Sequence, residues 1–103
     1  MKRFFHVVDE GKLVWGTDDR YRPPSLVQEG FVHASFREAV LESARLYFAP
    51  DARLLVMVID PEKLDVPVRI EMTPRGPMPH IFGPIPRRAV QVIAIGEFST
   101  IPA

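Results

Sequence analysis

The chain has 103 residues, of which 47% are apolar and 25% charged, and thirteen basic residues balance thirteen acidic ones. This composition excludes a disordered chain, and a net charge of zero argues against nonspecific binding to nucleic acid. The absence of cysteine excludes disulfides, thiolate catalysis and sulfur-ligated metal sites. We expect one domain over residues 1–103. Because we find neither a signal-peptide core nor a membrane-length apolar stretch, we expect a cytoplasmic protein that does not bind membranes.

The first third of the chain predicts one strand, a loop and a single helical turn. Arg3 to Val8 is apolar on both faces apart from His6, as is typical of an interior strand. Lys12 to Trp15 is compatible with a short return strand or an irregular segment. Residues 24–30 fit one helical turn, which Gly30 would end in a left-handed conformation.

The main helix is predicted from about Phe36 to Phe48, directly after a short strand over residues 31–34. Ser35 and Glu38 have the S-x-x-E spacing of a capping box, in which both side chains satisfy backbone N–H groups at the helix start. A stripe of apolar side chains predicts that one face of the helix packs on a sheet. That stripe comprises Val40, Leu41, Ala44, Tyr47 and Phe48.

The second half of the chain is rich in strands. Leu54 to Ile59 predicts an interior strand, and residues 68–73 alternate in polarity, which would place Glu71 on a polar face. Residues 74–86 are interpreted as a proline-rich loop that carries His80, and residues 89–95 as the last strand. With only one strong helix to cover these strands, we expect an α+β fold of two small packed or strongly bent sheets with one main helix.

The three histidines are the first candidates for a functional site, because imidazole titrates near neutral pH and can donate, accept or ligate. His33 lies just before the helix start, where an anion could bind, and His80 is held between prolines. His6 has a partly buried setting. Each also has a structural interpretation, as a satisfied core or loop residue. Their spacing matches no metal-binding motif, so no metal site is predicted.

Other residues extend the candidate site. Tyr21, Arg22 and Ser25 lie in a proline-stiffened segment suited to stacking and phosphate contacts, or simply to bracing a loop. Glu71 is a candidate partner for a histidine, although neighbouring arginines offer an ordinary ion-pair explanation. The chain has no phosphate loop, dinucleotide fingerprint or nucleophile elbow. The sequence leaves open whether Ser25 or Ser35 is a nucleophile that is paired with a histidine.

Four sequence blocks together resemble the domain of unknown function 952 family. They are Tyr21-Arg22-Pro23-Pro24-Ser25-Leu26, Glu29-Gly30-Phe31-Val32-His33-Ala34-Ser35, Ile59-Asp60-Pro61 with Leu64, and Pro79-His80-Ile81-Phe82-Gly83-Pro84. The resemblance implies an ADP-ribosyltransferase-like fold with two small sheets around a cleft. It also implies that His6 contacts a ribose of NAD and that Glu71 stabilises a reacting sugar cation.

The site expected from residues and resemblance together is a cleft that binds a nucleotide or ribose-phosphate ligand. The cofactor is left open, with NAD or a related nucleotide as a candidate. His80 and Glu71 are the candidate catalytic residues. The candidate ligand-binding residues are His6, Tyr21, Arg22, Ser25, His33 and Ser35. The alternative is a noncatalytic module that binds a small ligand or a protein. The oligomeric state is left open.

Overall fold

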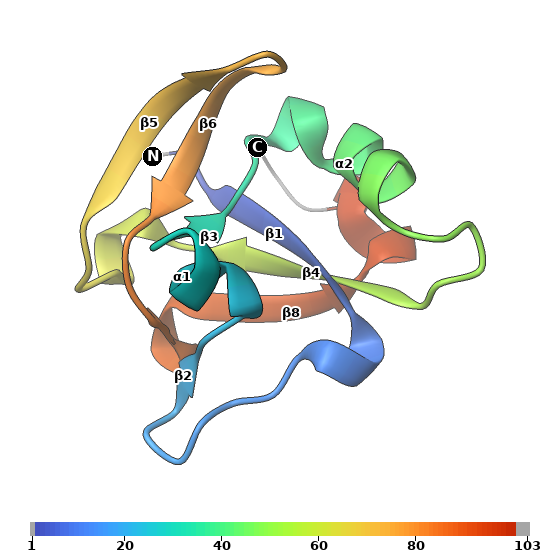
Figure 1. The fold of residues 1–103 in the computed structure, drawn as a ribbon. Coiled ribbons are helices and arrows are strands. Elements are labelled where there is room, and N and C mark those ends of the chain that lie inside the picture. Colours follow the sequence, from blue (N-terminus) through green and yellow to red (C-terminus); the bar gives the residue numbers. More distant parts are fainter. Residues whose placement is uncertain (1, 101–103) are drawn as a thin grey trace.

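In the computed structural model, which describes residues 2–100, the strands form three small antiparallel sheets (Figure 1). The strands are β1 (Phe4–Asp9), β2 (Arg20–Tyr21), β3 (Val32–His33), β4 (Leu54–Ile59), β5 (Val68–Thr73), β6 (Gly76–Ile81), β7 (Ile85–Pro86) and β8 (Val90–Ala94). The helices are α1 (Pro24–Gln28) and α2 (Val40–Tyr47), and short 3₁₀ turns join several elements. The protein is therefore a mixed α and β fold with one main helix.

The central sheet has the strand order β1-β4-β8 and is covered on both faces. Successive side chains of a strand point to opposite faces, so β1 and β4 each feed two separate cores. One core contains Phe4, Val8, Met57 and Ile59 and packs against the other strands. The second contains Phe5, Val7, Val56 and Val58, together with residues of α2 and of the C-terminal 3₁₀ segment. Other strands thus cover one face of the central sheet, as the shortage of helices predicted, whereas α2 and the 3₁₀ segment cover the other face. The described strands form three sheets, not the two that the sequence predicted.

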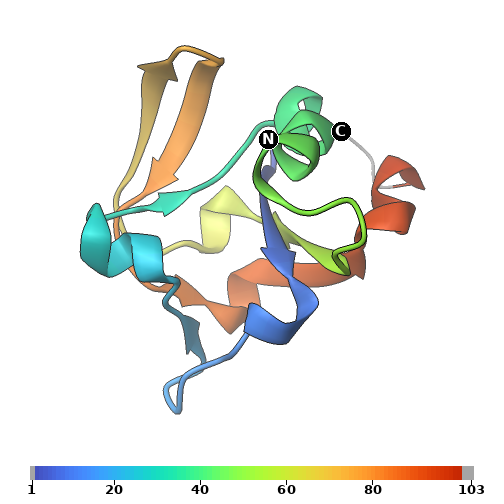
Figure 2. The ribbon, with the colours of Figure 1, turned by 45° about the vertical axis from the view of Figure 1, so that its right-hand side comes forward.

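The second three-stranded sheet has the order β3-β6-β5 and meets the central sheet at β1. The junction consists of two backbone hydrogen bonds, in which Phe5 N donates to Ser35 O at 2.9 Å and Ser35 N donates to Phe5 O at 2.7 Å. β5 and β6 form a hairpin that projects from the molecule on one side, with α2 on the other (Figure 2). Hairpin and helix are therefore held at fixed positions relative to β1.

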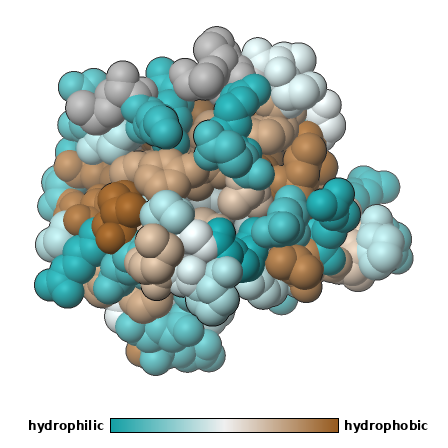
Figure 3. All heavy atoms as spheres, turned by 90° about the horizontal axis from the view of Figure 1, so that it is seen from above, coloured by the Kyte–Doolittle hydropathy of each residue, from teal (hydrophilic) through white to brown (hydrophobic). Residues whose placement is uncertain are grey.

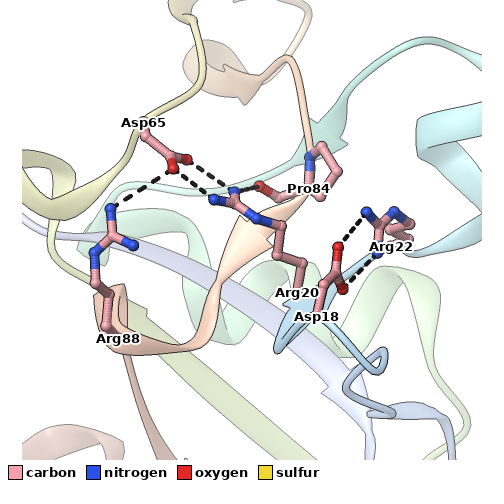
Figure 4. A network of polar contacts seen from close by, with 6 residues as sticks. All are labelled: Asp18, Arg20, Arg22, Asp65, Pro84 and Arg88. Carbon is pink, nitrogen blue, oxygen red and sulfur yellow. Dashed lines mark hydrogen bonds and ion pairs between the residues drawn. The ribbon is translucent and has the colours of Figure 1, made fainter.

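The two-stranded sheet of β2 and β7 is fastened by a network of charged side chains (Figure 4). Arg20 donates two hydrogen bonds to the Asp65 carboxylate, at 2.9 and 2.5 Å, and a third to Pro84 O at 3.3 Å. Arg88 lies 3.6 Å from the same carboxylate. The hydrogen bonds from Arg20 lower the pKa of Asp65 to about 2. This network ties the loop before β5 to the segment that enters β7.

The start of the main helix corrects the sequence prediction. Residues 37–39 form a 3₁₀ turn before α2, and Phe36, not Ser35, is its N-cap, without a side-chain hydrogen bond. The Ser35 hydroxyl instead lies 3.2 Å from the Ser43 hydroxyl, so the capping box does not form. The buried face also differs, because Leu41 and Tyr47 are 53% and 67% exposed whereas Ser43 is buried.

His80 lies in strand β6, so the prediction of a proline-rich loop over residues 74–86 was wrong. The physical reason lies in the direction of the backbone groups. Pro79 O accepts a hydrogen bond from Ala34 N of the segment after β3, so Pro77 and Pro79 direct their missing N–H groups toward the β3 side. The β3 side carries only a short pairing, whereas the full ladder runs to β5. Prolines on that side cost the sheet little.

At the start of β5, Val68 packs against the core and Arg69 is exposed, as the pattern predicted, but farther along the strand the two faces are the reverse of the prediction. Ile70 and Met72 are 53% and 78% exposed, whereas Glu71 and Thr73 are only partly exposed. The hairpin projects beyond the core, so the apolar side chains at its far end stay largely exposed, while the polar face turns toward the rest of the protein. Glu71 consequently lies on the side that carries the histidines.

Candidate functional site

A cleft of about 630 Å³ lies between β1, the hairpin and α2. Its volume falls within the range of small-molecule sites. His6, His33 and His80 line it, with apolar walls that include Phe48 and Met78. Figure 3 looks down on the side of the molecule that carries the end of the hairpin, where apolar atoms gather in a broad region bordered by hydrophilic side chains. Imidazoles from distant parts of the chain therefore share one accessible hollow.

His33 and His80 form a pair because the strands that carry them are in register. His33 of β3 pairs with His80 of β6, so both side chains emerge on the same face of the sheet. Their ring centroids are 5.5 Å apart and their planes are nearly perpendicular. His33 is exposed, whereas His80 is only 8% exposed. The pair thus combines a ring at the rim of the cleft with a ring that is almost enclosed.

Each ring of the pair is held by a glutamate. The Nδ1 atom of His80 lies 2.8 Å from Oε1 of Glu71, which is its diagonal neighbour on β5. Nε2 of His33 contacts Oε2 of Glu29, four residues earlier, across the turn that Gly30 makes with φ of +86°. A carboxylate on one ring nitrogen fixes the orientation of an imidazole. Among residues 2–100, the other nitrogen of each ring has no protein partner.

Phe31 packs against both rings, although the sequence did not predict it as a site residue. Its ring stacks on His80 with centroids 4.1 Å apart and meets His33 edge-on at 4.8 Å. Aromatic packing of this kind restricts the rotation of the rings it touches. The signal available in the sequence was the position of Phe31, two residues before His33 on the same strand face.

His6 lines the cleft but is fully engaged by the protein. Because a carbonyl can only accept, Nδ1–H of His6 donates to His33 O at 2.6 Å, and Nε2 then accepts from the Tyr21 hydroxyl at 3.0 Å. Burial lowers the pKa of His6 to about 4 and raises the pKa of Tyr21 to about 12. His6 is therefore neutral near pH 7, and it positions the backbone of His33.

Arg75 closes the far end of the cleft and is a second residue that sequence reasoning did not place in the site. From the turn of the hairpin it donates to Glu42 at 2.9 Å and to the Ser43 hydroxyl at 3.0 Å, both on α2. It therefore connects hairpin and helix across the cleft. A long-range contact of this kind leaves no mark on local sequence patterns.

The structure brings some of the predicted site residues together and leaves others apart. His6, His33, Ser35 and His80 line the cleft, and Glu71 and Tyr21 contact it through hydrogen bonds to histidines. Arg22 and Ser25 are not among the lining residues.

Arg22 instead donates two hydrogen bonds, at 2.9 and 2.7 Å, to Asp18, and these lower the pKa of Asp18 to about 2. Ser25 lies in α1. Among residues 2–100, no three histidine or carboxylate side chains are arranged to hold a metal ion.

The model of a family described as "Protein of unknown function (DUF952)" matches residues 10–93, which is most of the chain. The chain belongs to the DUF952 family. No curated protein matches this DUF952 chain. Within the described residues, no helix has the length and apolarity needed to cross a membrane.

The fold of this DUF952 protein is similar to the crystal structure of protein CC0527 from Caulobacter crescentus. The two chains are 20% identical, with a TM-score of 0.75, and the match covers 89% of this chain and 84% of that chain. A double-methionine variant of CC0527 matches with 19% identity and the same TM-score and coverage. At this identity the likeness shows the fold alone.

Proposed function

We propose that the cleft binds a small ligand that contains a ribose-phosphate group, such as a nucleotide, and that His80 acts on it as a proton-transferring residue while His33 hydrogen-bonds its ribose hydroxyls. The observation that carries the proposal is the geometry of these two imidazoles. They lie 5.5 Å apart beside a cleft of about 630 Å³, each with a glutamate on one nitrogen, and the other nitrogen has no partner in the part of the chain that the structure describes.

The shape and chemistry of the cleft support a ligand with a flat apolar part and a polar part. Phe48, Tyr47 and Met78 offer apolar and aromatic surface on which a nucleobase could stack. The histidines offer donors and acceptors for hydroxyl or phosphate oxygens. Arg75 adds a guanidinium at the opposite end. The expected ADP-ribosyltransferase-like resemblance favours NAD or a related nucleotide within this class.

For a transfer or hydrolysis reaction at the anomeric carbon of the ribose, each residue has a separate role. Nε2 of His80, oriented by Glu71, takes a proton from the attacking hydroxyl or water while that oxygen bonds to the anomeric carbon. The bond from this carbon to the leaving group breaks, and the leaving group departs with the electron pair. His80 then gives the proton to the leaving group or to solvent. His33 hydrogen-bonds the ribose hydroxyls. Glu71 acts through His80, and His6 acts through the backbone of His33, because both are already hydrogen-bonded within the protein. This assignment moves Glu71 from the sugar cation to the orientation of the base.

A noncatalytic binding role for the same cleft is the second candidate. It is favoured by the engagement of polar side chains within the protein, since both nitrogens of His6 are hydrogen-bonded and Arg75 is held by Glu42 and Ser43. Such a site recognises a ligand without changing it. The two candidates share one pocket and differ only in whether the bound compound is converted.

The experiment is a thermal-shift panel of NAD, ADP-ribose, mononucleotides and cyclic phosphates, followed by product analysis of each compound that stabilises the protein. A ligand at a hundred times its Kd should raise the Tm of a domain of this size by roughly 10 °C. His80→Gln and His33→Ala should reduce that shift. Arg22→Ala is the matched control, because Arg22 pairs with Asp18 and does not line the cleft.

Product formation from a stabilising compound would select the catalytic candidate, and stabilisation without product would select the binding candidate. If no compound of the panel stabilises the protein, or if the two histidine variants respond like the wild type, the proposal is wrong.

A further inference from the structure

Strand β5 lies at the edge of its sheet with one row of backbone groups unpaired. The strand order β3-β6-β5 places it last, so only one of its sides pairs with β6 among the described residues. Phe82 N donates to Pro67 O, and the register pairs Arg69 with His80, so the odd-numbered residues direct their backbone groups toward β6. The N–H and C=O groups of Val68, Ile70 and Met72 therefore face outward.

This edge lacks several of the devices that usually prevent association between sheets. Residues 68–73 contain no proline or lysine and form six uninterrupted residues of regular strand. Their two charged side chains, Arg69 and Glu71, are of opposite sign and lie on the face of the sheet that carries His80. The side chains of Ile70 and Met72 are 53% and 78% exposed on the apolar face of the hairpin. An open strand with exposed apolar side chains is a template for a second strand.

The sequence of β5 is complementary to itself in the antiparallel direction. If two copies meet with Ile70 opposite Ile70, then Val68 lies opposite Met72 and Arg69 lies opposite Glu71. The hydrogen-bonding residues of one copy then face those of the other, because Val68, Ile70 and Met72 all carry outward backbone groups. The same register places two pairs of opposite charges side by side on one face and apolar residues on the other.

We propose that this protein forms a homodimer by antiparallel pairing of β5 with β5 of a second copy, centred on Ile70. We choose a second copy of this chain as the partner of the edge strand because one register does two things. It pairs the outward N–H and C=O groups of β5, and it also places Arg69 of each copy opposite Glu71 of the other. In this dimer Arg69 of each copy faces Glu71 of the other, on the side of the sheet where Glu71 holds His80. The proposal does not depend on the proposed function.

The test is sedimentation velocity over a concentration series extending into the millimolar range. Wild type should change from monomer to dimer as concentration rises. Arg69→Glu should raise the dimer Kd by about tenfold or more, since it places like charges opposite each other twice. Adding Glu71→Arg to that variant restores opposite charges and should restore the dimer, which distinguishes lost pairing from a damaged fold.

Arg45→Glu is the matched control, because Arg45 is an exposed residue of α2 and the change in net charge is the same. It should leave the dimer Kd unchanged. Hydrogen exchange supplies a second measurement: the amides of Val68, Ile70 and Met72 should become protected as concentration rises. A monomer at every concentration, or equal weakening by Arg45→Glu, would overturn the proposal.

Discussion

His6 should make the stability of the protein depend on pH in a defined direction. Burial lowers its pKa from 6.5 to about 4. Between these values the unfolded chain binds a proton that the folded chain does not, so the free energy of unfolding falls as the pH falls from about 6.5 toward 4. At 1.36 kcal/mol per pH unit the full difference is roughly 3.4 kcal/mol. Because the side chain is only partly buried, we expect about 2–3 kcal/mol.

The assay is urea unfolding of the wild type and of His6→Gln at several pH values between 7 and 4. Glutamine can still donate to His33 O and accept from the Tyr21 hydroxyl, but it does not titrate. The other ionisable groups are common to both proteins, so the difference between their unfolding free energies isolates His6. We expect wild type to lose about 2–3 kcal/mol relative to the variant as the pH falls. A difference that stays constant with pH would refute the reasoning.

Two further substitutions test the packing around the site. Gly83→Ala would place a Cβ 2.6 Å from Cγ1 of Val66, so urea unfolding should show a loss of about 1–3 kcal/mol. Gly96→Ala, whose new Cβ has no atom of residues 2–100 within 4 Å apart from its chain neighbours, should change stability little. A larger loss of stability for Gly96→Ala than for Gly83→Ala would contradict this packing. Arg75→Ala removes the hydrogen bonds between the hairpin and α2 and should cost about 1–2 kcal/mol, and Arg45→Ala is its control. Equal losses in those two variants would count against a connecting role for Arg75.

Local patterns in the sequence predicted the elements that depend on local chemistry. The strand at residues 54–59 became the centre of a sheet because its residues are apolar on both faces. Gly30 ends α1 with a positive φ, as its place after the helical turn predicted. The mixed α and β class followed from the small share of helix-forming sequence.

Features set by distant contacts could not be predicted in this way. Pro77 and Pro79 predicted a loop, but a proline is tolerated in a strand when its missing N–H faces a side with little pairing, and only the sheet order shows that side. Ser35 had the spacing for a capping box, yet its hydroxyl lies against Ser43 in the fold. Local spacing indicates what a residue can do, and the tertiary fold selects among those options.

The candidate site also contains some residues that the sequence indicated and others that only the fold places there. His33 and His80 were singled out by their sequence contexts, and the register of β3 with β6 places them together. The only signal for Phe31 was its position two residues before His33, and Arg75 had none, because the stacking of Phe31 on His80 and the contacts of Arg75 with α2 arise only when the hairpin packs.

The most direct measurement of the central claim is long-range ¹H–¹⁵N NMR of the histidine rings during titration with nucleotides and ADP-ribose. The account predicts that the ring resonances of His33 and His80 shift with added ligand, while those of His6, whose two nitrogens are hydrogen-bonded within the protein, shift least. Ring resonances of His33 and His80 that remain unchanged with every compound of this class would contradict it.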